Sequence, residues 1–137
     1  HVTADGKFVN AWGKAGAGPG EFNAPHAAIV DGKGRLLVCD RDNERIQIFN
    51  QEGHLLATWT GYKPFGIAMD GDGVFFICGN NQVSQLDADG KVVRSWGKEG
   101  VEAGQFKTPH LMAADKHGNL YIAEVSGRRL QMLKRIR

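Results

Sequence analysis

The feature that most constrains the fold is a pattern of residues that recurs at intervals of about 40 positions. In three segments a proline stands six residues before an aspartate, the aspartate three before a glycine, and the glycine four before an aliphatic residue. The residues of this pattern are Pro25, Asp31, Gly34 and Val38; Pro64, Asp70, Gly73 and Ile77; and Pro109, Asp115, Gly118 and Ile122. Trp12, Trp59 and Trp96 each follow the glycine of an Asp-Gly or Glu-Gly turn by six residues. So many matching offsets indicate a structural repeat.

One unit of this repeat reads as four strands joined by turns. The expected strands are short stretches rich in apolar and β-forming residues, at 27–30, 35–39, 45–49 and 54–59. Turn-forming residues separate them at Asp31 to Gly34, at Asp40 to Asn43 and at Gln51 to Gly53. No window of useful length has helical periodicity, which favours an all-β fold.

Four strands in about 40 residues are typical of one blade of a β-propeller. We therefore predict a single domain over residues 1–137 with three blades, over residues 25–61, 64–97 and 109–137. The hairpin in the middle of the second repeat is shorter than its counterparts, and only five residues connect Trp59 to Pro64. The corresponding connections at 13–26 and 97–110 are long and match each other position for position.

The third repeat supplies three strands, and residues 5–12 repeat the pattern of 89–96, the fourth strand of the second repeat. Three blades are too few to close a ring, since propellers have about four to eight. Two chains could form a six-bladed ring, with each segment 5–12 completing the last blade of the other chain. Alternatively, the sequence is half of a longer polypeptide, and its start inside a repeat agrees with an upstream segment.

Composition excludes some classes of partner. A net charge of +2 argues against nucleic acid, and no apolar run is long enough to cross a membrane. Basic residues near the C-terminus fit a solvated edge strand better than a binding patch, namely Arg128, Arg129, Lys134, Arg135 and Arg137. Cys39 and Cys78 occupy equivalent positions in successive blades, too far apart for a disulfide, so we expect two buried free thiols.

The segments FNAPHAAIVDGKGRLLVCDRDNERIQIF, WGKEGVEAGQF and YIAEVSGRRLQML resemble NHL-repeat propellers. Among these the chain is most similar to the C-terminal half of bacterial proteins related to peptidyl-α-hydroxyglycine α-amidating lyase. The resemblance implies zinc in the central channel, held by histidines of alternate blades, with a tyrosine and arginines completing the site. Residue by residue, it implies metal ligands at His26 and His110 and a catalytic arginine at Arg41.

The sequence also departs from that family. Phe65 follows the proline of the middle repeat, where the other two repeats have histidine. The turn that carries Asp-Gly-Tyr in the family reads Cys78-Gly79-Asn80-Asn81, without a tyrosine. Glu124-Val125 leaves no arginine at the position that matches Arg41. These departures weaken the case for catalysis.

Simpler structural roles are available for the same residues. His26 and His110 could line a wet channel, and Arg41 and Arg45 could brace their hairpin against Asp40 and Asp42. Gln47 and Gln131 are expected on the blade surface, and the three tryptophans in the packing within or between blades.

Two functional hypotheses follow. The preferred one is a scaffold that binds a small molecule, peptide or protein at the channel mouth, with Phe65, Arg45 and Asp40 as binding residues. The alternative is a zinc-dependent lyase at the same channel. The expected partner in either case includes a second copy of the chain.

Overall fold

A computed structural model describes residues 1–136 of the chain, and their secondary structure is almost entirely β. The first sheet contains β1 (Pro25–Val30), β2 (Leu36–Asp40), β3 (Arg45–Phe49) and β4 (Leu55–Thr60). The second contains β5 (Gly66–Met69), β6 (Phe75–Gly79), β7 (Gln82–Leu86) and β8 (Val92–Trp96). The third contains β9 (Pro109–Ala114), β10 (Leu120–Glu124) and β11 (Arg129–Leu133). A single 3-10 turn, η1 (Arg41–Asn43), joins β2 to β3. The all-β prediction is confirmed.

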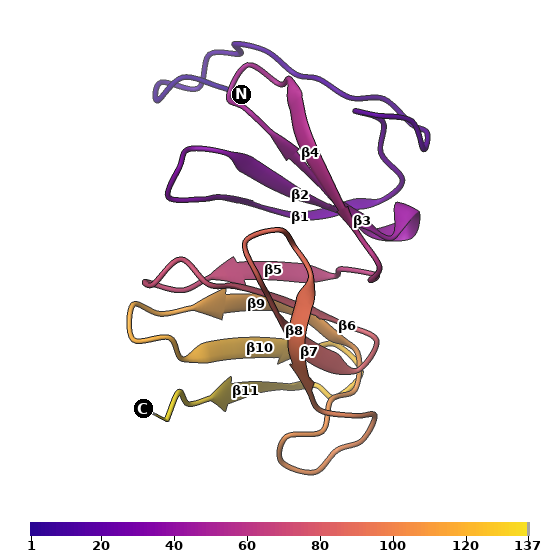
Figure 1. Ribbon diagram of the computed structural model, residues 1–137, viewed down its shortest axis with the longest axis vertical. Helices are drawn as coiled ribbons and strands as arrows, with labels where there is room; N and C mark the ends of the chain where they lie inside the picture. Colours follow the sequence, from indigo (N-terminus) through magenta and orange to yellow (C-terminus); the bar gives the residue numbers. More distant parts are fainter. Residues whose placement is uncertain (137) are drawn as a thin grey trace.

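Each sheet is an antiparallel meander in chain order, and the three sheets are stacked one after another (Figure 1). Neighbouring sheets meet through their first strands, β1 against β5 and β5 against β9. The four-strand reading of the first two repeats and the three-strand reading of the third agree with the structure. Within residues 1–136, no helix is long and apolar enough to cross a membrane.

The recurring aspartates close the turn between the first two strands of each sheet. Asp31 Oδ1 accepts hydrogen bonds from the backbone N–H groups of Lys33 and Arg35, both at 2.9 Å. Asp70 and Asp115 do the same for the residues two and four positions after them. The glycine three positions after each aspartate has a positive φ of 74° to 83°, a conformation that glycine adopts without a steric penalty.

The core lies between the sheets rather than within one of them. One cluster joins the first two sheets and includes Leu37, Cys39 and Ile46 on one side and Ile67 and Ile77 on the other. A second cluster joins the second and third sheets, with Phe76, Cys78, Val83, Phe106, Leu120 and Ile122. Both cysteines are free and buried, as predicted, and burial raises the pKa of Cys78 to about 12.

Trp12 and Trp59 pack in the same way against the turn before the last strand of the next sheet. A Cβ added to Gly53 would lie 2.7 Å from Trp12 Cδ2, and one added to Gly90 would lie 2.1 Å from Trp59 Cδ2. Trp59 is buried, whereas Trp96 is 38% exposed. The predicted packing role is therefore confirmed for Trp59, while Trp96 lies at an open edge.

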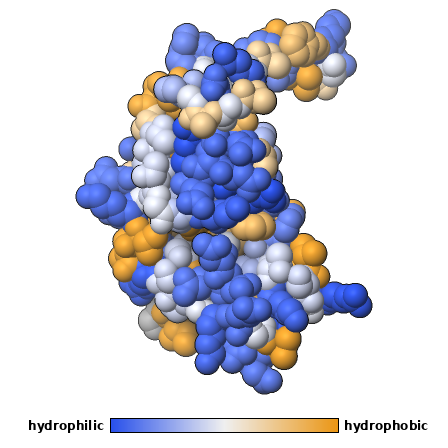
Figure 2. All heavy atoms as spheres, turned by 90° about the vertical axis from the view of Figure 1, so that its right-hand side faces the viewer, coloured by the Kyte–Doolittle hydropathy of each residue, from blue (hydrophilic) through white to orange (hydrophobic). Residues whose placement is uncertain are grey.

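Residues 5–12, expected as a closing strand, do not join any of the three sheets. Instead, Val2 and Phe8 form an isolated antiparallel bridge, and Phe8 is 73% exposed. Elsewhere the exposed apolar residues form separate patches among hydrophilic ones on the face seen in Figure 2. The exposed large apolar side chains of the described residues include Val30 on β1 and Leu111, Leu130 and Met132 on the third sheet.

Candidate functional site

Three side chains from the three blades meet where the first strands converge. The His26 and His110 rings lie 4.4 Å apart between centroids, and the Phe65 ring lies 5.4 Å from His26 and 5.8 Å from His110. His26 and His110 are the second residues of β1 and β9, and Phe65 directly precedes β5. The Pro-His and Pro-Phe positions singled out in the sequence thus form one aromatic cluster, here called the channel cluster.

The hydrogen bond of His26 fixes the state of its ring. His26 Nδ1 lies 2.5 Å from the backbone carbonyl oxygen of Phe65. Because a carbonyl oxygen can only accept, Nδ1 carries the proton and donates it, which leaves a lone pair on Nε2 when the ring is neutral. The pKa of His110 is lowered, chiefly by desolvation and also by the nearby His26 and Arg41. The His110 ring therefore favours the neutral form near pH 7.

Arg41 extends the channel cluster from η1. Its guanidinium carbon lies 5.2 Å from the centroid of the Phe65 ring, within the range of a cation–π contact. Its Nε and Nη2 donate to the two carboxylate oxygens of Asp42, at 3.0 and 3.1 Å. Lys63 Nζ lies 3.1 Å from the same carboxylate. The hydrogen bond from Arg41 is the largest cause that lowers the pKa of Asp42 to about 2. Bracing of Arg41 against Asp42 is thus observed.

The turn of the middle blade is tightly packed at its glycine. A Cβ added to Gly79 would lie 2.3 Å from the Lys63 carbonyl oxygen and 3.3 Å from the Phe65 ring. Asn80 and Asn81 continue the turn with positive φ values of 48° and 58°, which asparagine tolerates. The approach of Lys63 and Phe65 leaves no room for a side chain at position 79.

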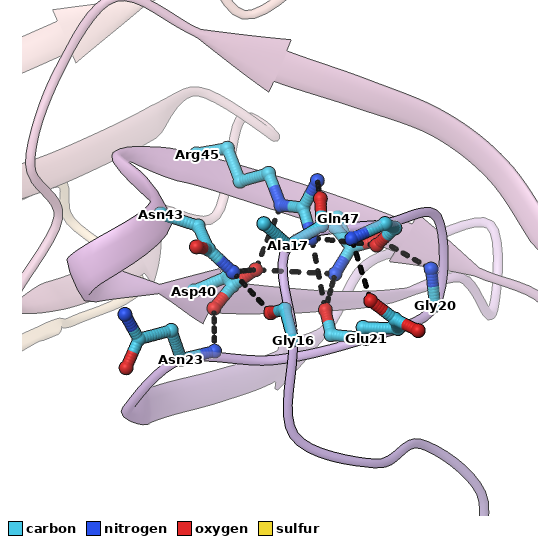
Figure 3. A network of polar contacts seen from close by, with 10 residues as sticks. Gly16, Ala17, Gly20, Glu21, Asn23, Asp40, Asn43, Arg45 and Gln47 are labelled. Atoms are coloured by element: carbon cyan, nitrogen blue, oxygen red, sulfur yellow. Dashed lines mark hydrogen bonds and ion pairs between the residues drawn. The ribbon is translucent and has the colours of Figure 1, made fainter.

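A polar network holds loop 13–24 against the first blade (Figure 3). At its centre, Arg45 Nε donates to Asp40 Oδ2 at 2.7 Å, and the Asp40 side chain is fully buried. The other guanidinium nitrogens of Arg45 donate to the carbonyl oxygens of Ala17, Gly18 and Glu21 at 2.8 to 2.9 Å. Asp40 and Arg45, the predicted binding residues, thus form hydrogen bonds with this loop. Arg45 also braces its hairpin against Asp40, as the simpler structural role expected.

The prediction that Gln47 lies on the blade surface is wrong. Its side chain is fully buried because the loop covers it. Gln47 Nε2 donates to the Glu21 carbonyl oxygen at 2.7 Å, and its Oε1 accepts from the Gly20 N–H at 2.9 Å. A polar residue in the strand is stable there because both ends of its amide are paired.

The third blade repeats this network with different residues. Glu124 replaces the aspartate, and Arg129 Nε donates to Glu124 Oε1 at 2.7 Å. Gln131 Nε2 donates to the Gln105 carbonyl oxygen at 2.8 Å, which holds loop 97–108. Arg129 is therefore structural, and so is Arg135, which bridges to Asp70 and Asp72 of the second blade at 3.2 and 2.7 Å. Two residues of the predicted basic cluster are therefore engaged in ion pairs, and Arg137 lies outside the described residues.

A sequence signal for these networks exists. The two repeats with the long loop carry an acid, an arginine and a glutamine at matching positions. The repeat with the short connection carries Gly79, Gln82 and Ser84 there. The long loop and the polar triad thus occur together. Lys63, which pairs with Asp42 beside the channel cluster, had no such signal.

The donor set of the channel cluster only partly fits the zinc site that the resemblance implies. His26 and His110 could offer two imidazole nitrogens, whereas a catalytic zinc usually has about three protein ligands. Over the described part of the chain, no group of three or more histidine, cysteine, aspartate or glutamate side chains could hold a metal ion. The residues described do not complete such a site.

Comparisons with known proteins support the repeat assignment. No family profile matches the chain. It is 32% identical over 137 residues to NHL repeat-containing protein 3 of Homo sapiens, covering 90% of this chain and 40% of that protein. It is 34% identical over 67 residues to peptidyl-glycine alpha-amidating monooxygenase A of Xenopus laevis. This match covers 45% of this chain and 7% of that protein.

Solved structures show the same fold at low sequence identity. A putative exported protein from Bacteroides fragilis superposes with a TM-score of 0.69 at 16% identity, over 96% of this chain and 43% of that one. The WD40 β-propeller domain of Doa1 superposes with a TM-score of 0.58 at 16% identity, over 77% of this chain and 34% of that one. The chain thus spans less than half the length of these proteins. Its repeat, its stacked sheets and these likenesses together support an NHL-type β-propeller architecture.

Proposed function

We propose that the chain is a propeller scaffold that binds a small molecule, peptide or protein at the mouth of its central channel. The observation that carries the proposal is the channel cluster, to which three successive blades contribute His26, Phe65 and His110 within 6 Å of one another. Polar and aromatic groups that converge from separate elements are typical of ligand sites.

The chemistry of the channel cluster favours a ligand with both an apolar face and a polar group. Phe65 offers an aromatic surface, and an imidazole in its neutral form has a nitrogen that can accept a hydrogen bond. Arg41 and Lys63 share the single carboxylate of Asp42, so the local charge is positive. A carboxylate or another anionic group on the ligand therefore suits this site.

We further propose that the chain forms half of a six-bladed ring, which a second copy closes. The chain covers 43% of the exported protein from Bacteroides fragilis, and this share is consistent with half a ring. Leu130 and Met132 on the third blade are 67% and 54% exposed, whereas the matching Ile46 and Ile48 of the first blade are fully buried by the second. An apolar face of this kind calls for a further blade against it.

A zinc-dependent α-amidating lyase is the alternative function. Two observations favour it: the partial likeness to a peptidyl-glycine alpha-amidating monooxygenase, and the carbonyl that orients His26 as carbonyls orient many metal-binding histidines. Against it stand the two-imidazole donor set and the turn without a tyrosine. We expect at most partial zinc occupancy and no appreciable turnover of peptides that end in α-hydroxyglycine.

The two functions are separated by a pair of experiments on one set of variants. NMR spectra of the chain mixed with short peptides and small aromatic carboxylates should show shifts centred on His26, Phe65 and His110. A His110→Ala variant should lose them, whereas His117→Ala, in an exposed turn, should keep them. Shifts elsewhere, or none, contradict the binding proposal. Stoichiometric zinc after dialysis that is lost in a His26→Ala, His110→Ala double variant would instead favour the lyase.

A further inference from the structure

A groove between the first and second sheets lies at the opposite end of the strands from the channel cluster. Its volume is about 400 Å³, within the range of sites for small ligands. Its lining comes from the turns that follow β1, β5 and β7 and from the strands beside them. Figure 1 shows the turns after β1 and β5 at the left, whereas η1, which contains Arg41, points to the right. Each of these two sheets has four strands, so the groove results from the stacking of neighbouring sheets.

The groove has an apolar floor and one charged residue on each side. Phe75 and Leu86 of the second sheet are buried, and Met69 packs beside them, so these three residues form the floor. Lys33 lines the groove from the first sheet, and Asp87 lines it from the second. Over residues 1–136, neither of these two side chains takes part in an ion pair. Two opposite charges therefore line one groove without neutralising each other.

Arg35, which also lines the groove, already has its counter-ion. Arg35 Nε donates to Asp31 Oδ2 at 2.7 Å, and Arg35 Nη2 lies 2.7 Å from the same oxygen. The Asp31 side chain is only 3% exposed, so this pair belongs to the turn after β1. Among the described residues that line the groove from the first sheet, Lys33 is thus the cation that can bind an anion from outside.

The turn that contains Asp87 does not need the charge of this residue. Asp87 Oδ1 accepts a hydrogen bond from the Lys91 N–H at 2.9 Å. In the matching turn of the first sheet, Asn50 Oδ1 accepts the same bond from the His54 N–H at 2.8 Å, so a neutral amide oxygen is sufficient. Within residues 1–136, Asp87 Oδ2 has no hydrogen-bond partner. This second carboxylate oxygen is therefore available to an ammonium group.

An ion pair spans the matching place between the second and third sheets. Asp72 corresponds to Lys33, and Arg135 corresponds to Ala88, by their positions relative to the paired strands. Arg135 Nη1 lies 2.7 Å from Asp72 Oδ2, and the pair thus links the two sheets. Ala88 has no charge and is too short to make such a link to the first sheet. The groove between the first two sheets is therefore left open where its counterpart is bridged.

From these observations we infer that this groove binds a zwitterionic dipeptide with apolar side chains. Asp87 binds its ammonium group, Lys33 binds its carboxylate, and the apolar floor receives a side chain. Complementary charges at the two ends of the ligand fix its orientation. Because Lys33 and Asp87 do not pair directly, the ligand has to bridge them, and a second residue adds about 3.8 Å to its reach. The inference goes beyond the proposed function, since the groove and the channel cluster share no residue.

Three forms of one peptide test the two charges. In isothermal titration calorimetry, Leu-Leu with free termini should bind about tenfold more tightly than its N-acetylated form or its C-terminal amide, because each of these lacks one charge. Asp87→Asn, which retains the turn as Asn50 does, should remove the preference over the acetylated peptide and keep the preference over the amide. Lys33→Gln should have the reverse effect. Preferences that stay the same in both variants would overturn the inference.

Controls separate this groove from other sites. Asp89→Asn and Lys91→Gln remove charges of the same turn that do not line the groove, and both should leave the affinity for Leu-Leu unchanged. His110→Ala should also leave it unchanged. Loss of binding in His110→Ala would place the peptide at the channel cluster, which overturns this inference and leaves the proposed function standing. Equal affinity for free leucine would overturn the assignment of a dipeptide, and no binding of Leu-Leu at about 10 mM would overturn the site.

Discussion

Two arginines four residues apart on one hairpin have very different surroundings. Arg45 bonds a fully buried carboxylate and three loop carbonyls, and its own side chain is only 12% exposed. Arg41 pairs with Asp42, and both side chains remain partly exposed. The two ion pairs therefore differ in their contribution to stability, because water screens the pair of Arg41 with Asp42 but not the buried pair of Arg45 with Asp40.

The first prediction compares these arginines. Arg45→Met should destabilise the fold by about 3 kcal/mol, because it leaves the Asp40 carboxylate buried without its cation. Arg41→Met should cost only about 0–1 kcal/mol, as exposed ion pairs do. Chemical denaturation of both variants measures the difference. Equal stabilities would show that Arg45 does not hold loop 13–24 as described.

The second prediction concerns the thiols. Burial raises the pKa values of both Cys39 and Cys78, and a thiol reacts through its thiolate. In the native state both should react with a thiol reagent on the order of 100-fold more slowly than in the unfolded chain. Rapid labelling of both without denaturant would contradict the packing between blades.

At the scale of the elements, the strands and their turns were readable from the sequence, but the loops that cover them were not. The expected strand at 45–49 coincides with β3, and the aspartate turns follow local chemistry that spans four residues. Gln47 was misplaced because its partner, Glu21, lies 26 residues earlier in a loop without periodicity. Local pattern fixes which side of a strand a residue faces, but not whether a distant loop covers that side.

The same limit applies to the candidate site. The matching Pro-His positions predicted that His26 and His110 would be equivalent, and the structure brings their rings together. The bond from His26 to the Phe65 carbonyl could not be predicted, since it depends on how two blades stack. The absence of the tyrosine was visible in the sequence, whereas the approach of Lys63 to Gly79 required the structure.

The third prediction tests the tryptophan packing between blades. Gly90 and Gly73 both have a φ of 80°, but only Gly90 lies against a tryptophan, while the space around Gly73 is open. Gly73→Ala should cost about 1–2 kcal/mol from the left-handed backbone alone. Gly90→Ala should cost about 1–3 kcal/mol more, because its Cβ collides with Trp59. Thermal unfolding compares the two variants, and an equal loss of stability would exclude a tight contact.

At the scale of the whole molecule, the two ends of the stack of sheets differ from its middle. Within residues 1–136, the third sheet has an unpaired strand edge and an exposed apolar face, and the N-terminal segment packs on the first sheet through Trp12 and Gly53. In the ring that we propose, two copies related by a two-fold axis cover both ends at once, because the surface at one end of each chain complements that at the other. The channel cluster is then repeated around one axis.

The mass of the chain in solution tests this account most directly. Light scattering at micromolar concentration should give about twice the chain mass of 14.9 kDa. Trp12→Ala should lower that mass toward the monomer, because it removes the contact that seats the N-terminal segment on Gly53. A folded wild-type chain that has a mass of 14.9 kDa at micromolar concentration would contradict the two-copy ring.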